Sequence, residues 1–198
     1  MWVQTISGRK VDLLNPRPAD IDLNDIASAL SRIARLNGHT HWPYSVAQHC
    51  TLGAVWARRS GFQAAGQLAL RFLLHDAHEA YIGDIARPVA QALCDSTRLM
   101  LARQRLDAAI WASLTHGAPF YGRDLVEDAV KEIDLRMLRA ERDQLCAAPP
   151  ASWGAAIEAV QALPVVIHQL SAEEAREQWL HQFDFLTSPA KHREGADL

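Results

Sequence analysis

The stretch from about residue 63 to residue 80 is apolar on nearly every side, through Leu68-Ala69-Leu70 and Phe72-Leu73-Leu74. Apolar side chains around the whole circumference predict a helix that is central and buried. The composition agrees with this prediction, since 33 Ala and 24 Leu outnumber 10 Val and 10 Ile. Helix formers therefore outweigh β-branched residues, and we expect an all-α fold.

Capping signals and apolar periodicity predict further helices on both sides of this segment. They are expected from Asp22 or Asn24 to about Arg35 with a stop at Asn37-Gly38, from the capping box of Ser45 and Gln48 to about Arg59, near 96–113, near 124–145, near 152–162, and from the capping box of Ser171 and Glu174 onward. Before them, residues 3–11 read as two short strands about a Ser-Gly turn. The last residues, 190–198, read as a flexible tail.

Charge and cysteine content exclude several classes of protein. The net charge of −3 lacks the basic excess of a dedicated nucleic-acid binder. No secretory signal is visible in residues 1–15, and no apolar run is long enough to span a membrane. Cys50, Cys94 and Cys146 are far apart and never form a Cys-x-x-Cys pair, which favours reduced thiols over structural zinc. We expect a cytoplasmic protein with no nucleic-acid or membrane partner.

Acids and imidazoles occupy core-facing positions on three of the expected helices. His49 lies beside the apolar stripe of the helix after Ser45, and Asp134 is one helical step from Val130. The stripe of the central segment continues to a further set, which is His75, Asp76 and Glu79. Three helices are therefore expected to direct polar groups toward the core.

Buried carboxylates such as Asp76 and Asp134 require a cation, a dense set of donors or a shifted pKa. Two neutral imidazoles and two carboxylates balance one divalent ion and leave open positions for water and substrate. The alternatives are a hydrogen-bonded core histidine at His49 and a buried salt bridge between Asp134 and an arginine. Such alternatives would have to hold independently on three helices, so one shared metal site is the favoured interpretation.

The pattern of His49, His75-Asp76 and Asp134 resembles the H…HD…D signature of the HD-domain phosphohydrolases. Residues 75–79, followed by Gly83-Asp84-Ile85, are similar to the HD-x-x-E…GD segment of the 5′-deoxynucleotidase branch. Residues 31–39 and 44–49 are similar to phage and prophage members, a group that includes enzymes acting on deoxynucleoside triphosphates such as dATP. The likeness spans about residues 5–145.

The resemblance implies an HD-domain helical bundle with a small N-terminal β-hairpin. It would form a single domain over residues 1–198. Its expected parts are a hairpin in 1–15, the HD core in 19–145, C-terminal helices in 151–188 and the tail in 190–198.

The resemblance also implies roles for individual residues. Glu79 matches the acid that handles the proton of the water or leaving group, and a structural carboxylate is the alternative. Asp84 matches an acid near the scissile phosphate, and an N-cap for a short helix at Ile85 is the alternative. The implied metal ligands are His49, His75, Asp76 and Asp134.

Substrate contacts are implied for a few further residues. Arg35 matches an arginine that contacts substrate, with a solvated surface arginine as the alternative. Lys131 lies one turn before Asp134, where it could neutralise phosphate. His39 is another candidate substrate contact.

Two departures from the family pattern bear on the substrate. Leu36 stands where bacterial monophosphatases have Trp, which favours the phage-like group. Ala90, in Pro88-Val89-Ala90, stands where the family has Lys, and Arg87 is the candidate for the missing charge.

The expected function is a metal-dependent phosphohydrolase that removes phosphate from (deoxy)nucleotides, a deoxynucleoside triphosphate such as dATP or a monophosphate. The cofactor would be one divalent transition metal, Mn, Fe, Co, Ni or Zn, with additional Mg if the substrate is a polyphosphate. The resemblance also implies a homo-oligomer, a dimer or larger. The alternatives are an alarmone or cyclic-nucleotide hydrolase with the same metal core, and a non-catalytic interaction module stabilised by metal. The base, the number of phosphates and the bond cut stay open.

Overall fold

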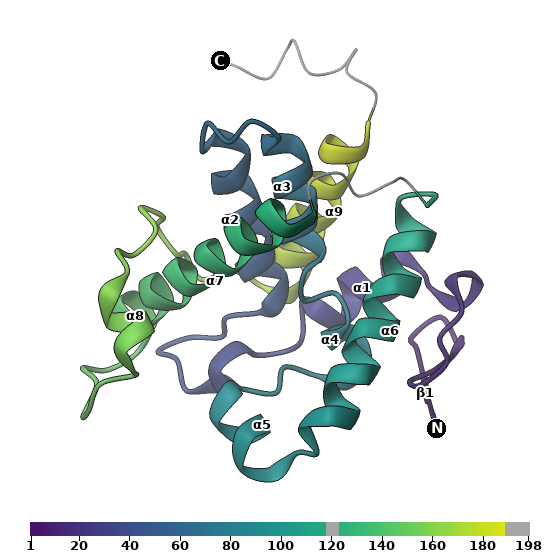
Figure 1. Cartoon of the computed structure of the whole chain (residues 1–198), viewed down its shortest axis with the longest axis horizontal. Coiled ribbons are helices and arrows are strands. Elements are labelled where there is room, and N and C mark those ends of the chain that lie inside the picture. Colours follow the sequence, from purple (N-terminus) through teal and green to yellow (C-terminus); the bar gives the residue numbers. More distant parts are fainter. Residues whose placement is uncertain (118–122, 189–198) are drawn as a thin grey trace.

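The computed structural model describes residues 1–117 and 123–188, and its helices surround a buried centre (Figure 1). The elements are β1 Trp2–Gln4, β2 Lys10–Asp12, the 3-10 turn η1 Pro18–Asp20, α1 Leu23–Leu30, the 3-10 turn η2 Arg35–Gly38, α2 Val46–Arg59, α3 Ala65–Leu74, α4 Glu79–Ile82, α5 Arg87–Leu93, α6 Ser96–Leu114, α7 Arg123–Leu145, α8 Ala155–Ala159 and α9 Ala172–Thr187. The expected all-α fold with a small N-terminal hairpin is confirmed. The predicted tail, 190–198, lies outside the described residues.

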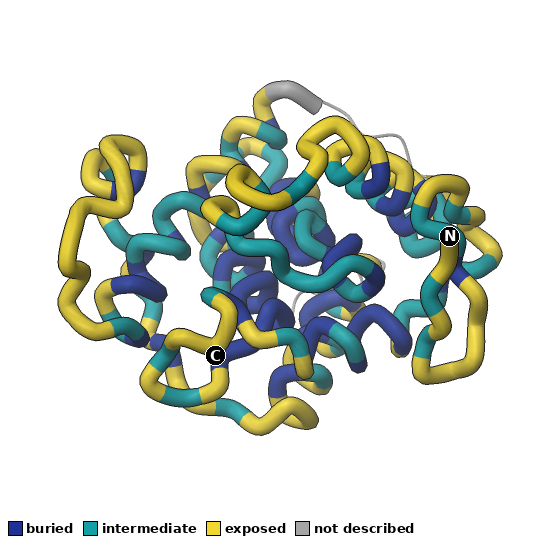
Figure 2. The backbone as a smooth tube through the Cα atoms, turned by 90° about the horizontal axis from the view of Figure 1, so that it is seen from below, coloured by how far each residue is buried: buried dark blue, intermediate teal, exposed yellow. Residues whose placement is uncertain are grey.

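Helices α2, α3 and α9 form the centre of the molecule, and α7 crosses in front of them (Figure 1). Leu68, Phe72 and Leu73 of α3 are buried, as the apolar circumference of this segment predicts. Trp179 of α9 packs into the same core with no exposed surface. In Figure 2 the buried residues gather in the interior, and most of the exposed residues lie at the periphery.

The central segment is not one helix from 63 to 80, and that prediction is wrong at its C-terminal end. Helix α3 ends at Leu74, and the shorter α4 begins at Glu79. Between them the backbone N–H groups of Ala77 and Glu79 donate to carbonyls three residues back, those of Leu74 and Asp76. Such i→i−3 bonds tighten the last turn of a helix. The His75-Asp76 pair therefore lies on a tight turn rather than on a regular helix.

The first helix also ends earlier than predicted, at Leu30 instead of about Arg35. The Arg35 N–H donates to the Tyr44 carbonyl at 3.0 Å, and the Val46 N–H donates to the Ile33 carbonyl at 3.1 Å. These long-range backbone bonds replace the last helical turn. The left-handed backbone expected near Asn37-Gly38 is present, but it forms the η2 turn after Arg35 instead of capping a helix.

Capping and turn signals in the sequence predicted the boundaries of other elements correctly. The reciprocal capping boxes at Ser45 and Ser171 are both formed. Strands β1 and β2 pair antiparallel with Val3 opposite Val11, and Ser7 in their connection donates through its N–H and hydroxyl to Asp25 of α1. Two short elements differ from the prediction: α5 is not among the predicted helices, and α8 is shorter than 152–162. No helix among the described residues has the length and apolar character needed to cross a membrane.

Candidate metal centre

The four predicted metal ligands converge from three separate segments, which are α2, the turn after α3, and α7. The Nε2 atom of His49 lies 3.3 Å from Asp134 Oδ1 and 3.9 Å from Asp76 Oδ2. The Nε2 atom of His75 lies 3.1 Å from Asp76 Oδ2 and 3.9 Å from Asp134 Oδ1. Two imidazole nitrogens therefore face the same two carboxylates.

The other nitrogen of each ring is already committed to the protein. Nδ1 of His49 is 2.6 Å from Glu141 Oε1, and Nδ1 of His75 is 2.6 Å from the Phe72 carbonyl oxygen. An ionised carboxylate and a carbonyl can only accept, so both Nδ1 atoms carry a proton. In the neutral rings both Nε2 atoms then present a lone pair, as metal-binding histidines do.

These two Nε2 atoms are buried and have no hydrogen-bond partner among the described residues. Lone pairs that point at carboxylate oxygens repel them unless a cation or a proton lies between. Although burial opposes charge on His49, the carboxylates of Glu141 and Asp134 raise its pKa to about 9. Burial likewise opposes charge on His75, and Asp76 and Asp134 raise its pKa to about 9. The donor set thus has a strong preference for positive charge, which fits a divalent metal.

Arg35 lies beside this donor set and is buried. Its guanidinium is 3.3 Å from Asp76 Oδ2, 3.3 Å from Glu141 Oε2 and 4.0 Å from Asp134 Oδ1. Burial opposes its charge, but these carboxylates raise its pKa well above the usual range. The solvated-surface alternative for Arg35 is therefore wrong. The salt-bridge alternative for Asp134 and the core-histidine alternative for His49 each have a partner here, Arg35 and Glu141 respectively.

Glu79 lies close to Asp76, and the charges of Asp76 and Asp84 both act on it. Glu79 is 5% exposed, and its Oε2 atom is buried without a hydrogen-bond partner. Burial, together with the charges of Asp76 and Asp84, raises the pKa of Glu79 to about 9. Burial also raises the pKa of Asp84. The alternative that Asp84 caps a short helix is wrong, because Ala86 is the N-cap of α5.

Two residues that the sequence analysis did not select also belong to the site. Glu141 follows Asp134 by two turns of α7 and reaches both His49 and Arg35. His78 contacts Asp107 of α6 through Nδ1 at 2.9 Å, and its ring lies close to the carboxylates of Asp76 and Glu79. Glu141 continues the helical stripe of Val130 and Asp134, so the periodicity of the sequence contained a signal for it. The contact of His78 depends on where α6 packs in the fold, which no local pattern predicts.

Three predicted substrate residues lie at more exposed positions. Lys131 pairs with Asp128 at 2.9 Å on the surface of α7. Arg87 is exposed at the start of α5, and the His39 side chain is exposed at the end of η2. The roles of these three residues in binding substrate remain predictions.

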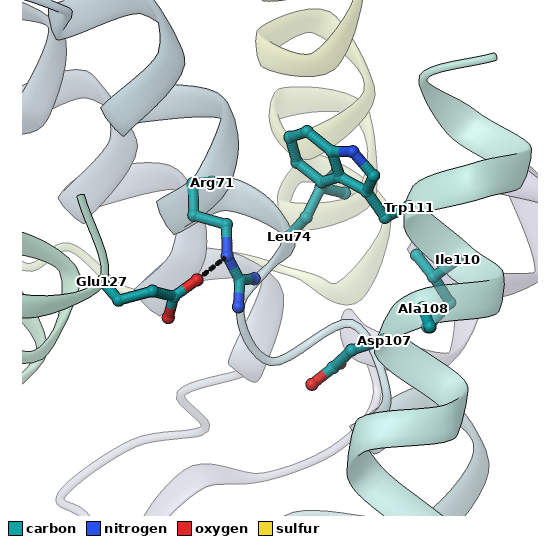
Figure 3. Close-up of a pocket in the computed structure, with 7 residues that line it drawn as sticks. All are labelled: Arg71, Leu74, Asp107, Ala108, Ile110, Trp111 and Glu127. Carbon is teal, nitrogen blue, oxygen red and sulfur yellow. Dashed lines mark hydrogen bonds and ion pairs between the residues drawn. The ribbon is translucent and has the colours of Figure 1, made fainter. Parts of the chain in front are cut away.

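A cavity of about 270 Å³ opens between α3, α6 and α7 (Figure 3). Arg71, one turn before His75, donates through Nε to Glu127 at 2.7 Å across this cavity. On the α6 side the labelled residues are Asp107, Ala108, Ile110 and Trp111. Asp107 lines the cavity and also contacts His78, so the cavity lies next to the turn that carries His75, Asp76 and His78.

The chain matches no protein-family model. It is similar to the uncharacterized protein RCAP_rcc00048 of Rhodobacter capsulatus, with 36% identity over 146 residues that cover 73% of this chain and 72% of that protein. It is also similar to the uncharacterized protein YfdR of Escherichia coli, with 35% identity over 144 residues and the same coverage of both chains. The chain belongs to the family of these two proteins.

Proposed function

We propose that this protein is a metal-dependent phosphohydrolase of the HD-domain type that removes phosphate from deoxynucleotides. One observation carries the proposal: two buried histidine Nε2 atoms and the carboxylates of Asp76 and Asp134 converge beside the guanidinium of Arg35. A metal bound by histidines and carboxylates suits hydrolysis, and an arginine next to it suits a phosphate ester.

Separate residues of the chain would bind the metal and orient the phosphate. His49, His75, Asp76 and Asp134 would hold a divalent transition metal, which supplies Lewis-acid activation of water and of a phosphoryl oxygen when bound. Arg35 reaches the same space and would orient the phosphate through its guanidinium.

Glu79 is the proposed proton carrier. Its Oε2 atom has no protein partner, and burial next to Asp76 and Asp84 keeps its proton bound in the metal-free protein. A protonated carboxyl at this place can give its proton to the leaving group, and the resulting carboxylate can later accept one from water. Asp84 lies near enough to favour the protonated form of Glu79 by charge repulsion.

The test is a phosphate-release assay on protein of known metal content, with deoxynucleoside mono- and triphosphates, an alarmone and cyclic nucleotides as substrates. We expect Asp134→Asn to lose both metal and turnover, while Asp184→Asn, at an exposed position on α9, keeps both. Chromatography of the products from dATP identifies the bond that is cut, through release of orthophosphate, pyrophosphate or triphosphate.

Each other outcome overturns part of the proposal. Turnover of only the alarmone or the cyclic nucleotides would keep the metal centre and reject the deoxynucleotide substrate. Stoichiometric metal with no turnover of any nucleotide would instead indicate a metal-stabilised interaction module.

A further inference from the structure

Glu141 is a fully buried carboxylate with three donors around it. Its Oε1 atom accepts from Nδ1 of His49 at 2.6 Å and from the hydroxyl of Tyr44 at 2.9 Å. Its Oε2 atom accepts from Nη2 of Arg35 at 3.3 Å. No part of its side chain is exposed. One carboxylate thus contacts both a metal ligand and the cation proposed to grip phosphate.

Such a carboxylate is costly to bury, and it is retained only where its partners satisfy it. Here one partner is the ring of His49, whose opposite nitrogen faces Asp134. A carboxylate behind a metal-binding histidine fixes the tautomer and the orientation of the ring and makes it a better ligand. The other partner, Arg35, also lies 3.3 Å from Asp76 and 4.0 Å from Asp134, so Glu141 competes with the proposed ligands for its charge.

We propose that Glu141 is a positioning residue that couples metal binding to phosphate binding, by holding His49 with one oxygen and Arg35 with the other. The part of this inference that concerns phosphate binding through Arg35 rests on the proposed function. The part that concerns metal binding depends only on the contact between Glu141 and His49.

The two oxygens can be separated by substitution because their donors differ. In Glu141→Gln the amide oxygen can still accept from His49 and Tyr44, but the amide nitrogen then faces the Arg35 donor. That variant is expected to release Arg35 and to retain most of the support of His49. Glu141→Met keeps a similar side-chain length but removes both oxygens, and with them the contacts to His49 and Arg35.

The experiment measures the affinity of the folded protein for metal and for phosphate. Competition with a chromophoric chelator gives the affinity for Co²⁺. Calorimetry on the Co²⁺-loaded protein gives the affinities for inorganic phosphate and for dAMP. Glu141→Gln should weaken Co²⁺ binding less than about tenfold and phosphate binding tenfold or more. Glu141→Met should weaken Co²⁺ binding by about 10–100-fold. The matched control, Tyr44→Phe, removes one donor to the same oxygen and should change both affinities less than about threefold.

A merely structural role predicts another result, a lower melting temperature of the metal-free variants with unchanged affinities, and that result overturns the inference. If Glu141→Met does not fold, Glu141→Gln still decides, because equal losses of Co²⁺ and phosphate affinity, or none, contradict the division between the two oxygens. If the wild type binds Co²⁺ but neither phosphate nor dAMP, the proposed function fails. A wild-type Co²⁺ affinity in Glu141→Met would then overturn the remaining half as well.

Discussion

His49 and His75 each use their two ring nitrogens for different purposes. Nδ1 is bound to a fixed acceptor of the protein, while Nε2 is buried and faces Asp76 and Asp134. An ordinary core histidine satisfies both nitrogens, since leaving a buried polar atom unpaired costs about 1–3 kcal/mol. Two such atoms that face the same two carboxylates therefore argue for a positive charge between them, from a metal ion or from protonation of the rings.

The role of Glu79 can be tested separately from that of the metal ligands. We expect Glu79→Gln to retain Co²⁺ affinity, because the amide keeps the size of the side chain and the four proposed ligands are untouched. Loss of the proton carrier should reduce kcat by about 10²–10⁴-fold. Steady-state kinetics with a parallel Co²⁺ titration check this. Unchanged kcat would show that Glu79 is a structural carboxylate.

At the scale of elements, the packing of α2 against α3 brings His49 and His75 together. Gly53 of α2 allows the close approach, because a Cβ atom there would lie 2.0 Å from Cε1 of Phe72. We expect Gly53→Ala to lower the free energy of unfolding by about 1–3 kcal/mol. The control is Gly66→Ala in α3, where a Cβ meets no atom within 4 Å. It should be neutral or stabilising by up to about 1 kcal/mol. Urea unfolding of both variants distinguishes local packing from a general intolerance of α2 and α3.

The contact between α7 and α8 should depend on pH. Burial opposes the charge of Glu158, but hydrogen bonds from the Trp153 N–H and from Arg142 lower its pKa below the usual value. Its contribution to stability is therefore present above the unfolded pKa of about 4.3 and is lost as the pH falls. We expect Glu158→Gln to melt at a lower temperature than the wild type at pH 7, with the two converging below about pH 4.

Thermal melts across this pH range check the prediction, with Glu132→Gln as the control. Glu132 is an exposed residue of α7 whose carboxylate is 3.7 Å from Arg136. Its substitution should change the melting temperature little at either pH, because exposed ion pairs contribute little. A difference between Glu158→Gln and wild type that persists at pH 3 would contradict the assignment to charge.

At the scale of the whole molecule, the proposed metal site exists only in the folded chain, because its candidate ligands come from segments far apart in sequence. Metal should therefore stabilise the fold by about 2.7 kcal/mol at a concentration of 100 times Kd. For a chain of this size that corresponds to a rise in Tm of about 5–10 °C. We expect Co²⁺ to raise Tm, and removal by EDTA to reverse the rise. Asp134→Asn should abolish the effect and Asp184→Asn preserve it; a rise that survives Asp134→Asn would place the ion elsewhere.

The sequence by itself determined the helical class, the caps at Ser45 and Ser171 and the apolar stripes of α2 and α7. These depend on side chains within a few residues of one another, so local chemistry suffices to predict them. The same periodicity placed His49 in the core, whereas the Asp134 side chain is 34% exposed and not buried as predicted.

Only the tertiary structure decided where helices stop and which distant groups meet. The long-range backbone bond from Arg35 to Tyr44 ended the first helix early and placed the guanidinium beside Asp76. The tight turn after Leu74 set the direction of His75, and the crossing of α7 brought Glu141 to His49. Each of these contacts joins residues that have no local reason to be neighbours. The sequence could name the candidate ligands, but packing between elements determined how they are held.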